Sequence, residues 1–291
     1  MRIHSTLVLL SAVALLSACH PDGDGNAAFD QDGVSLAVFS VSPDRQVRFS
    51  RGNLQYQPST GQWRLAEAQY HYADEANGSI APDAAVWIDL FGWGTSGWNS
   101  GAVAYQPYCT STDYYDYYPG TSHTNSLEGH FEQADWGRYN SVGGTPRGFW
   151  RTLTAREWAY LLEQRPMAEA KRGVATIVGV CSGLVILPDN WRQPDNIVFN
   201  TSLTAVFDDY SANYYTTGQW GQMEQAGAIF LPAAGCRVGT ALYSMGQGGD
   251  YWSATAGGDR TAYALSFFGH RVVPDAQEDR SKGFSVRLVT D

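Results

Sequence analysis

The chain has 291 residues and a formal net charge of −10, with 19 Lys and Arg against 29 Asp and Glu. This acidic balance, without a cluster of basic residues, argues against nucleic acid as a partner. Ten Trp, seventeen Tyr and 31 Gly predict a loop-rich fold that is stabilised by aromatic packing. The length is sufficient for one large domain or two small ones.

Residues 1–19 have the pattern of a secretory signal. Arg2 and His4 precede an apolar run from Leu7 to Leu16, which is too short to span a bilayer and is followed by small residues and Cys19. The cysteine makes this segment resemble a bacterial lipoprotein signal. That resemblance implies cleavage before Cys19, the lipobox cysteine, and attachment of lipid to its sulfur. An ordinary signal peptide with an incidental cysteine is the alternative.

Residues 20–33 are rich in Gly and Asp and have little apolar bulk, which predicts a flexible acidic tether. Acidic residues directly after a lipidated cysteine resemble the signals that carry some Gram-negative lipoproteins to the outer face of the outer membrane. No later apolar run approaches membrane-spanning length. We therefore expect an outer-membrane lipoprotein, exposed at the cell surface of a Gram-negative bacterium and attached to the membrane only through its lipid anchor.

The first half of the remaining chain predicts strands and loops. Alternating residues from 34 to 56, with a turn at 42–44, predict short strands, and residues 61–74 predict another. Residues 87–101 place aromatic side chains between glycines, which indicates a loop folded onto the core. Residues 108–130 are polar, rich in Tyr and without periodicity, so we expect an irregular surface loop. Its composition is that of antibody-like binding loops, and a loop without a binding role is an equal alternative.

Two helices are predicted in the second half. Thr154 and Glu157 have the spacing of a capping box, in which each side chain satisfies a backbone donor of the other residue, and Pro166 ends this helix. Residues 216–226 predict a second, weaker helix that stops at Gly227.

The remaining segments predict strands. Residues 174–191 contain two apolar runs around Cys181–Gly183, which predicts a hairpin. Residues 229–239 predict a strand that turns into a loop, and 251–253 and 283–289 predict two more strands. Because helices and strands are segregated rather than alternating, we expect an α+β fold with two helices, short antiparallel strands and long irregular loops.

Three cysteines follow Cys19, namely Cys109, Cys181 and Cys236, so at most one disulfide forms among them. Cys181 and Cys236 each follow a strand-like run, which makes them the tentative pair. Three small buried residues without a disulfide are an equal alternative.

Several segments together carry a family resemblance. They are "RGFWRTLTAREWAYLL", "VILPDNW", "QAGAIFLPAAGCR", "GGDYWSAT" and "GFSVRLV". In this order they resemble the C-type lectin-like fold, in the branch shared by formylglycine-generating enzymes and the variable proteins of diversity-generating retroelements. The resemblance covers the chain from about residue 40 to 289. It implies a single C-type lectin-like domain over residues 34–291, which binds a protein or glycan ligand without catalysis. The ligand segment is residues 255–282, the part that retroelements diversify in such proteins.

Strand parity and loop position select the candidate ligand-binding residues within this segment. Between Thr261 and Gly269, Tyr263, Leu265 and Phe267 are expected to face the core, and the alternate residues to face outward. Loops held on a rigid scaffold are where binding residues concentrate. The predicted ligand-binding residues are Asp259, Arg260, Ser266, Phe268, His270, Arg271, Asp275, Gln277 and Lys282. An ordinary solvated surface residue is an equal alternative at each position.

Other functions are less well supported by the sequence. An oxidoreductase like the formylglycine-generating enzymes needs cysteine thiolates gathered to bind copper, and the cysteines here are not closely spaced. We therefore expect no enzyme, no cofactor and, with scattered histidines, no metal site. Residues 193–195, Gln-Pro-Asp, match a tripeptide of galactose-binding lectins, but a turn is favoured. An adhesin or fimbria-like assembly component remains the second function class.

Overall fold

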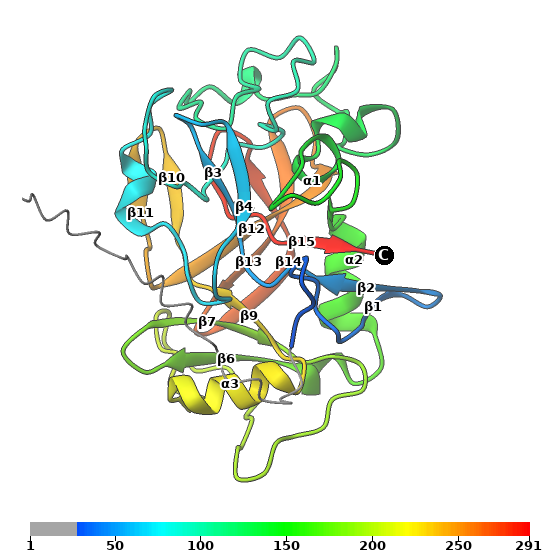
Figure 1. Cartoon of the computed structure of the whole chain (residues 1–291), viewed down its shortest axis with the longest axis vertical. Coiled ribbons are helices and arrows are strands. Elements are labelled where there is room, and N and C mark those ends of the chain that lie inside the picture. The colour runs from blue at the N-terminus through cyan, green and yellow to red at the C-terminus, as the bar shows by residue number, and fades with distance from the viewer. Residues whose placement is uncertain (1–27) are drawn as a thin grey trace, which may run out of the picture.

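The structure, a computed structural model, describes residues 28–291 (Figure 1). The predicted signal peptide, Cys19 and residues 20–27 of the tether lie outside the described residues. Residues 28–33 already form a turn, in which the Asp30 carboxylate accepts hydrogen bonds from the backbone N–H groups of Asp32 and Val34, both at 2.9 Å. The predicted tether therefore overlaps the start of the folded chain.

The fold is α+β, as predicted, with mostly sheet and few helices. Its strands are short, and the longest belong to the C-terminal third of the chain. The strands are β1 (Phe39–Ser42), β2 (Arg45–Phe49), β3 (Leu54–Gln57), β4 (Gln62–Leu65), β5 (Arg151–Thr152), β6 (Arg172–Ile177), β7 (Cys181–Ile186), β8 (Tyr214–Tyr215), β9 (Ile229–Pro232), β10 (Cys236–Val238), β11 (Ala241–Tyr243), β12 (Gly248–Ala256), β13 (Thr261–Phe268), β14 (Arg271–Asp279) and β15 (Leu288–Thr290).

Three larger sheets organise these strands. One has the order β1-β2-β15-β5 and joins the two ends of the described chain, because Val289 of β15 pairs with Phe49 of β2 and with Arg151 of β5. The second has the order β8-β6-β7-β9, and the third is the antiparallel sheet β12-β13-β14. The remaining pairs are β3-β4 and β10-β11. All of these pairings are antiparallel except β6 with β8.

The two predicted helices are confirmed. At α2 the Thr154 hydroxyl accepts from the Glu157 N–H at 3.2 Å, and the Glu157 carboxylate accepts from the Thr154 N–H at 2.8 Å, which is the predicted capping box. The positive φ of Gly227, +96°, follows the end of α3. The helices are α1 (Trp136–Tyr139), α2 (Ala155–Ala159), its π-helical continuation (Tyr160–Gln164) and α3 (Thr217–Gln225), with 3₁₀ turns at Asp74–Gly78, Tyr114–Asp116, Gly129–Ala134 and Ala168–Lys171. The short helix α1 had no counterpart in the prediction.

The core consists of three clusters of buried apolar side chains. The first contains the aromatic loop 87–101, as predicted, through Ile88, Phe91 and Trp93. The second lies beneath α2, and the third lies between α3 and the β8-β6-β7-β9 sheet. The β13 strand contributes Ala262 and Ala264 to the first cluster and Leu265 and Phe267 to the second. Both faces of β13 are therefore buried.

Two irregular loops occupy opposite ends of the long axis (Figure 1). The tyrosine-rich loop, residues 108–130, lies at the top of the view and contains only short 3₁₀ turns, as its lack of periodicity predicted. The loop between β7 and β8, residues 187–213, reaches the bottom of the view.

Candidate ligand-binding surface

The predicted ligand segment, residues 255–282, forms most of the β12-β13-β14 sheet rather than a set of loops. Residues 257–260 make the turn at one end of the sheet, and Gly269 and His270 make the turn at the other. The eight-residue strand β13 separates the two turns by about 25 Å. The predicted site residues are consequently divided between the two ends and the middle of one sheet.

Three predicted residues lie at the β12–β13 end. Asp259 and Arg260 in the turn are exposed, as expected. Gln277 of β14 lies opposite Tyr263 of β13. Its amide nitrogen donates to the Tyr263 hydroxyl at 3.2 Å, and its amide oxygen accepts from the Thr261 hydroxyl at 3.3 Å.

This end adjoins the tyrosine-rich loop. The Arg260 guanidinium lies 5.1 Å from the centre of the Tyr114 ring, a cation–π distance. Tyr114 packs on Tyr115 with ring centres 4.4 Å apart, and His123 packs between Tyr115 and Tyr118 at 5.2 and 4.4 Å. We call these groups the tyrosine–arginine surface: Tyr114, Tyr115, Tyr118, His123, Asp259, Arg260, Thr261, Tyr263 and Gln277. The sequence indicated the tyrosine-rich loop and the segment 255–282 as separate candidate binding regions. In the structure, parts of both contribute to this one surface.

Arg280 joins the two segments from beneath. Its side chain is fully buried, and its guanidinium lies 4.6 Å from the centre of the Trp93 ring. It donates to the carbonyls of Thr261 at 2.9 Å and Gly258 at 2.7 Å in the turn, and to those of Tyr117, at 3.2 Å, and His123 in the loop. Burial lowers the pKa of Arg280 to about 10, which leaves it charged at neutral pH. Sequence reasoning missed this residue, because the run Asp-Arg-Ser-Lys around it is typical of a solvated turn.

Three other predicted residues gather at the opposite end. Phe268 packs against Phe207 of the β7–β8 loop with ring centres 4.1 Å apart, and His270 lies 5.5 Å from the same ring. The Arg271 guanidinium lies 5.4 Å from the Phe268 ring. Only Arg271 is strongly exposed, whereas Phe268 and His270 are half-buried. These residues cannot share a small ligand with Arg260.

The middle of the sheet corrects the parity prediction. Ser266 is buried, with 4% of its surface exposed, because the face of β13 that was expected to point outward lies against the first core cluster. Lys282 is half-buried and makes an ion pair with Glu278 at 2.7 Å. Asp275 is exposed on β14, beside an irregularity in the β13–β14 pairing, and lies in a strand rather than in the expected loop.

The predicted disulfide is wrong. Cys109, Cys181 and Cys236 are all free thiols, and none is fully exposed. Cys181 packs against the third core cluster and Cys236 against the first, so different parts of the core hold them apart. Burial raises the pKa of Cys181 to about 12 and that of Cys236 to about 11.

Other features weighed in the sequence have structural outcomes. The Gln-Pro-Asp tripeptide forms a turn, as favoured, in which the Ile197 N–H donates to the Pro194 carbonyl at 3.3 Å. Within residues 28–291, no three His, Cys, Asp or Glu side chains are grouped so that they could hold a metal ion. No helix in that same part of the chain combines the length and the apolar character needed to cross a membrane.

Comparison of the chain with models of known protein families, with curated proteins and with solved structures finds no match. The geometry of the described residues is therefore what supports a function.

Proposed function

We propose that the protein is a surface-displayed outer-membrane lipoprotein that binds a protein or glycan ligand at the tyrosine–arginine surface, without catalysis. The observation that carries the proposal is the buried Arg280, whose guanidinium bonds carbonyls of both the β12–β13 turn and the tyrosine-rich loop. We also propose the C-type lectin-like fold for residues 34–291, related to the variable proteins of diversity-generating retroelements. The α+β architecture is compatible with that fold.

The chemistry of the surface supports ligand binding. Tyrosine rings offer large contact areas at low conformational cost, and their hydroxyl groups add hydrogen bonds. Arginine beside such rings is the other residue type enriched at the energetic centres of interfaces. Tyr115 is 44% exposed, although aromatic side chains are usually more deeply buried. The surface therefore combines aromatic rings, hydroxyls, one exposed arginine and one exposed aspartate on a backbone that Arg280 holds, a combination that suits a peptide or a sugar ring.

The test compares two arginines of the same sheet. Wild-type protein is applied to a glycan array and to a phage-displayed random peptide library, and the affinity of the best hit is measured by calorimetry. We expect Arg260→Ala and Tyr114→Ala each to weaken that affinity by about tenfold or more, which corresponds to about 1.4 kcal/mol. Arg271→Ala is the matched control, because Arg271 has a similar cation–π contact at the opposite end.

The stability and affinity of the two arginine variants also define the results that would contradict the proposal. Both arginine variants should melt within about 2 °C of wild type, since surface changes seldom exceed about 0.5 kcal/mol. Equal losses of affinity in Arg260→Ala and Arg271→Ala would show that binding depends on net charge rather than on this surface. A hit that depends on Arg271 alone would move the binding site to the other end.

An adhesin or fimbria-like assembly component is the second candidate function. The observation that favours it is the apolar surface of the β7–β8 loop, where Val198 is 75% exposed, Val206 55% and Phe207 45%. Exposed apolar patches mark contacts with other proteins. A concentration-dependent oligomer that dissociates in a Phe207→Ser variant, measured by light scattering, would favour this function over the first.

An oxidoreductase of the formylglycine-generating type is the least supported function. Copper(I) binds thiolates, and a raised pKa keeps the Cys181 and Cys236 thiols protonated at neutral pH. Their positions against different core clusters give no shared site. We therefore retain the non-catalytic proposal.

A further inference from the structure

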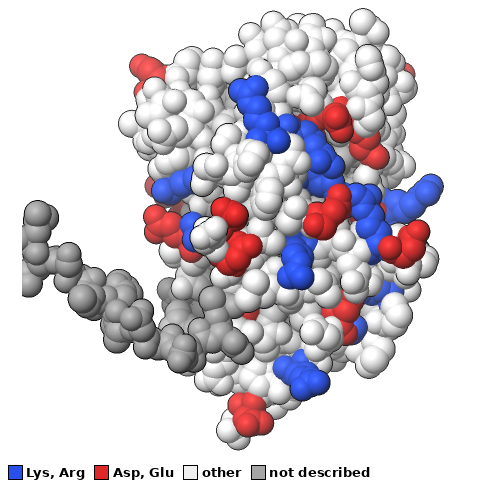
Figure 2. Space-filling model, turned by 45° about the vertical axis from the view of Figure 1, so that its right-hand side comes forward, with Lys and Arg blue, Asp and Glu red and all other residues white. Residues whose placement is uncertain are grey.

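An open groove shares none of its lining residues with the tyrosine–arginine surface. It has a volume of about 910 Å³ and lies between residues 41–45 of the β1–β2 hairpin and one side of the α2 helix, with Glu128 and Thr255 at its border. Pockets that hold small ligands have volumes of about 300–1,000 Å³. A recess of about 150 Å³ adjoins the groove and shares Arg45, Glu128 and Thr154 with it. The face with α2 and the hairpin, which comes forward in Figure 2, carries basic and acidic side chains side by side.

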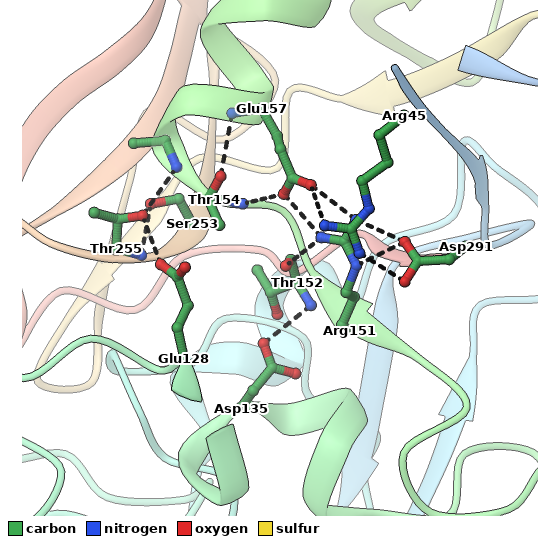
Figure 3. A network of polar contacts seen from close by, with 11 residues as sticks. Arg45, Glu128, Asp135, Arg151, Thr152, Thr154, Glu157, Ser253, Thr255 and Asp291 are labelled. Carbon is green, nitrogen blue, oxygen red and sulfur yellow. Dashed lines mark hydrogen bonds and ion pairs between the residues drawn. The ribbon is translucent and has the colours of Figure 1, made fainter. Parts of the chain in front are cut away.

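An ion-pair network between the groove and the recess is balanced in charge (Figure 3). The Arg151 guanidinium is buried and binds the Glu157 carboxylate through two hydrogen bonds of 2.8 Å. It also binds Asp291 at 2.9 Å, and Arg45 binds Asp291 at 2.7 Å and lies 3.6 Å from Glu157. The two guanidinium groups therefore neutralise the two carboxylates. None of these four groups has an uncompensated charge with which to bind a ligand.

The recess contains three further carboxylates and one further guanidinium. Glu128, Glu132 and Asp135 line it, and none of them has an ion-pair partner in the described part of the chain. Arg138, the one other basic residue in the lining, donates to the Gly148 carbonyl at 2.9 Å. Asp135 is 1% exposed and accepts only backbone N–H groups, and burial raises its pKa. Three carboxylates against one guanidinium, beside the balanced network, leave the recess with an excess of negative charge.

A buried hydroxyl in the same recess lacks a partner. Thr152 is 2% exposed and lines the recess. Its Oγ1 lies beside the Asp135 carboxylate, without the geometry of a hydrogen bond, and has no other partner within residues 28–291. A buried polar atom without a partner costs about 1–3 kcal/mol. Such an atom, beside a carboxylate that has no ion-pair partner, is what a bound donor group would satisfy.

We propose that the groove binds a ligand that carries a guanidinium group, and that this group enters the recess between Glu128, Asp135 and Thr152. A guanidinium presents five N–H donors in one plane and accepts no hydrogen bond, which matches two carboxylates and a hydroxyl oxygen. The recess is several times the volume of about 30 Å³ that one water molecule occupies in the liquid, so a planar group of four heavy atoms fits. The rest of the ligand lies in the open groove along α2.

The test uses two probes of nearly the same shape. L-Argininamide has the guanidinium, and L-citrullinamide replaces it with an uncharged ureido group. Calorimetry with the full-length protein should show argininamide binding about tenfold more tightly or better. Glu128→Gln and Thr152→Val should each remove about fivefold or more of that affinity. Glu163→Gln, the same charge change at an exposed residue outside the groove, should change it less than about twofold.

The melting temperature of Thr152→Val separates a loss of ligand binding from a general loss of stability. Because Thr152→Val removes an unpartnered buried hydroxyl and keeps the side-chain shape, the free protein should melt at the same temperature or about 2–4 °C higher. Higher stability together with weaker argininamide binding would support the proposal. A lower melting temperature would mean that Oγ1 is already satisfied in the free protein. That result, equal binding of the two probes, or equal losses in Glu128→Gln and Glu163→Gln would overturn it.

Discussion

The two ends of the β12-β13-β14 sheet are built from similar parts but are supported differently. Each end presents an exposed arginine near an aromatic ring, Arg260 at 5.1 Å from Tyr114 and Arg271 at 5.4 Å from Phe268. At the Arg260 end, one buried guanidinium, that of Arg280, bonds the carbonyls of the turn and of the neighbouring loop. At the Arg271 end, no buried guanidinium plays this part among the described residues; the Thr204 hydroxyl lies 3.2 Å from the Gly269 carbonyl of the turn and 2.8 Å from the Asp209 carbonyl of the loop.

Backbone contacts also hold the Arg271 end. The Gly269 N–H donates to the Phe207 carbonyl at 2.9 Å, and its carbonyl accepts from the Thr204 N–H at 3.1 Å. The approach is so close that a Cβ on Gly269 would lie 2.0 Å from the Asp209 carbonyl oxygen. The difference teaches that a buried guanidinium fixes one loop of this protein, whereas a close backbone approach at a glycine, with one hydroxyl, fixes the other.

The largest expected effect comes from breaking the Arg280 end. Arg280→Ala should lower the free energy of unfolding by about 3 kcal/mol or more, because it leaves several buried carbonyls without donors. Urea denaturation measures the loss. Hydrogen exchange should also become faster in residues 114–124 and 257–261 and stay unchanged around Gly269.

Two variants provide the controls for that experiment. Arg280→Lys keeps the charge but cannot reproduce the fork of N–H donors, so it should recover only part of the stability. Arg260→Ala, whose side chain is exposed, should leave both stability and exchange near wild type. Uniformly faster exchange over the whole sheet in Arg280→Ala would mean that the two ends are not independent.

A smaller effect is expected from breaking the Arg271 end. Gly269→Ala should cost about 2 kcal/mol, since the new methyl group pushes the β7–β8 loop away from the turn. Exchange should become faster in residues 202–209 and not in the tyrosine-rich loop. The matched control is Gly221→Ala in α3, where a Cβ meets nothing within 4 Å, and which should stabilise the protein by up to about 1 kcal/mol. A neutral Gly269→Ala would show that this loop adapts easily.

The sequence predicted the features that depend on local chemistry. The capping box of Thr154 and Glu157, the stop at Gly227 and the burial of the aromatic loop 87–101 each follow from neighbouring residues, and each is confirmed. The α+β class followed in the same way from the segregation of helices and strands.

The remaining features depend on contacts between distant segments. Ser266 was expected to face outward, but the parity rule assumes a sheet with one solvated face, and β13 is a central strand between two core clusters. Residues 271–279 were interpreted as loop because they show no regular pattern, and in β14 Pro274 and Asp275 lie at an irregularity in the pairing. Nothing near Arg280 in the sequence indicates that two of its partners are 157 and 163 residues away.

Two buried carboxyl groups should give the protein an unusual dependence on pH. Asp250 of β12 lies opposite Ser266, toward the Arg271 end, and burial raises its pKa from 3.8 to about 6. Asp89 is a buried residue of the aromatic loop 87–101, and burial raises its pKa from 3.8 to about 6 as well. Both bind a proton more tightly in the folded than in the unfolded chain, so stability falls as the pH rises from about 4 to about 6. Carboxyls with lowered pKa, such as Asp189 and Asp291, act in the opposite sense, but only below about pH 4.

The smallest predicted effect uses this pH dependence to compare the two ends. Thermal unfolding of the wild type should show a higher melting temperature near pH 5 than near pH 7. Asp250→Asn should reduce that difference by on the order of 1 kcal/mol, because an amide cannot lose a proton. Asp259→Asn, at the exposed Arg260 end, should leave the profile unchanged. A profile for Asp250→Asn that matches the wild type would mean that Lys282 and Arg271, which favour the charged form, compensate the burial of Asp250. In that case Asp89, together with Asp135, whose pKa burial also raises, would be responsible for the loss of stability toward neutral pH.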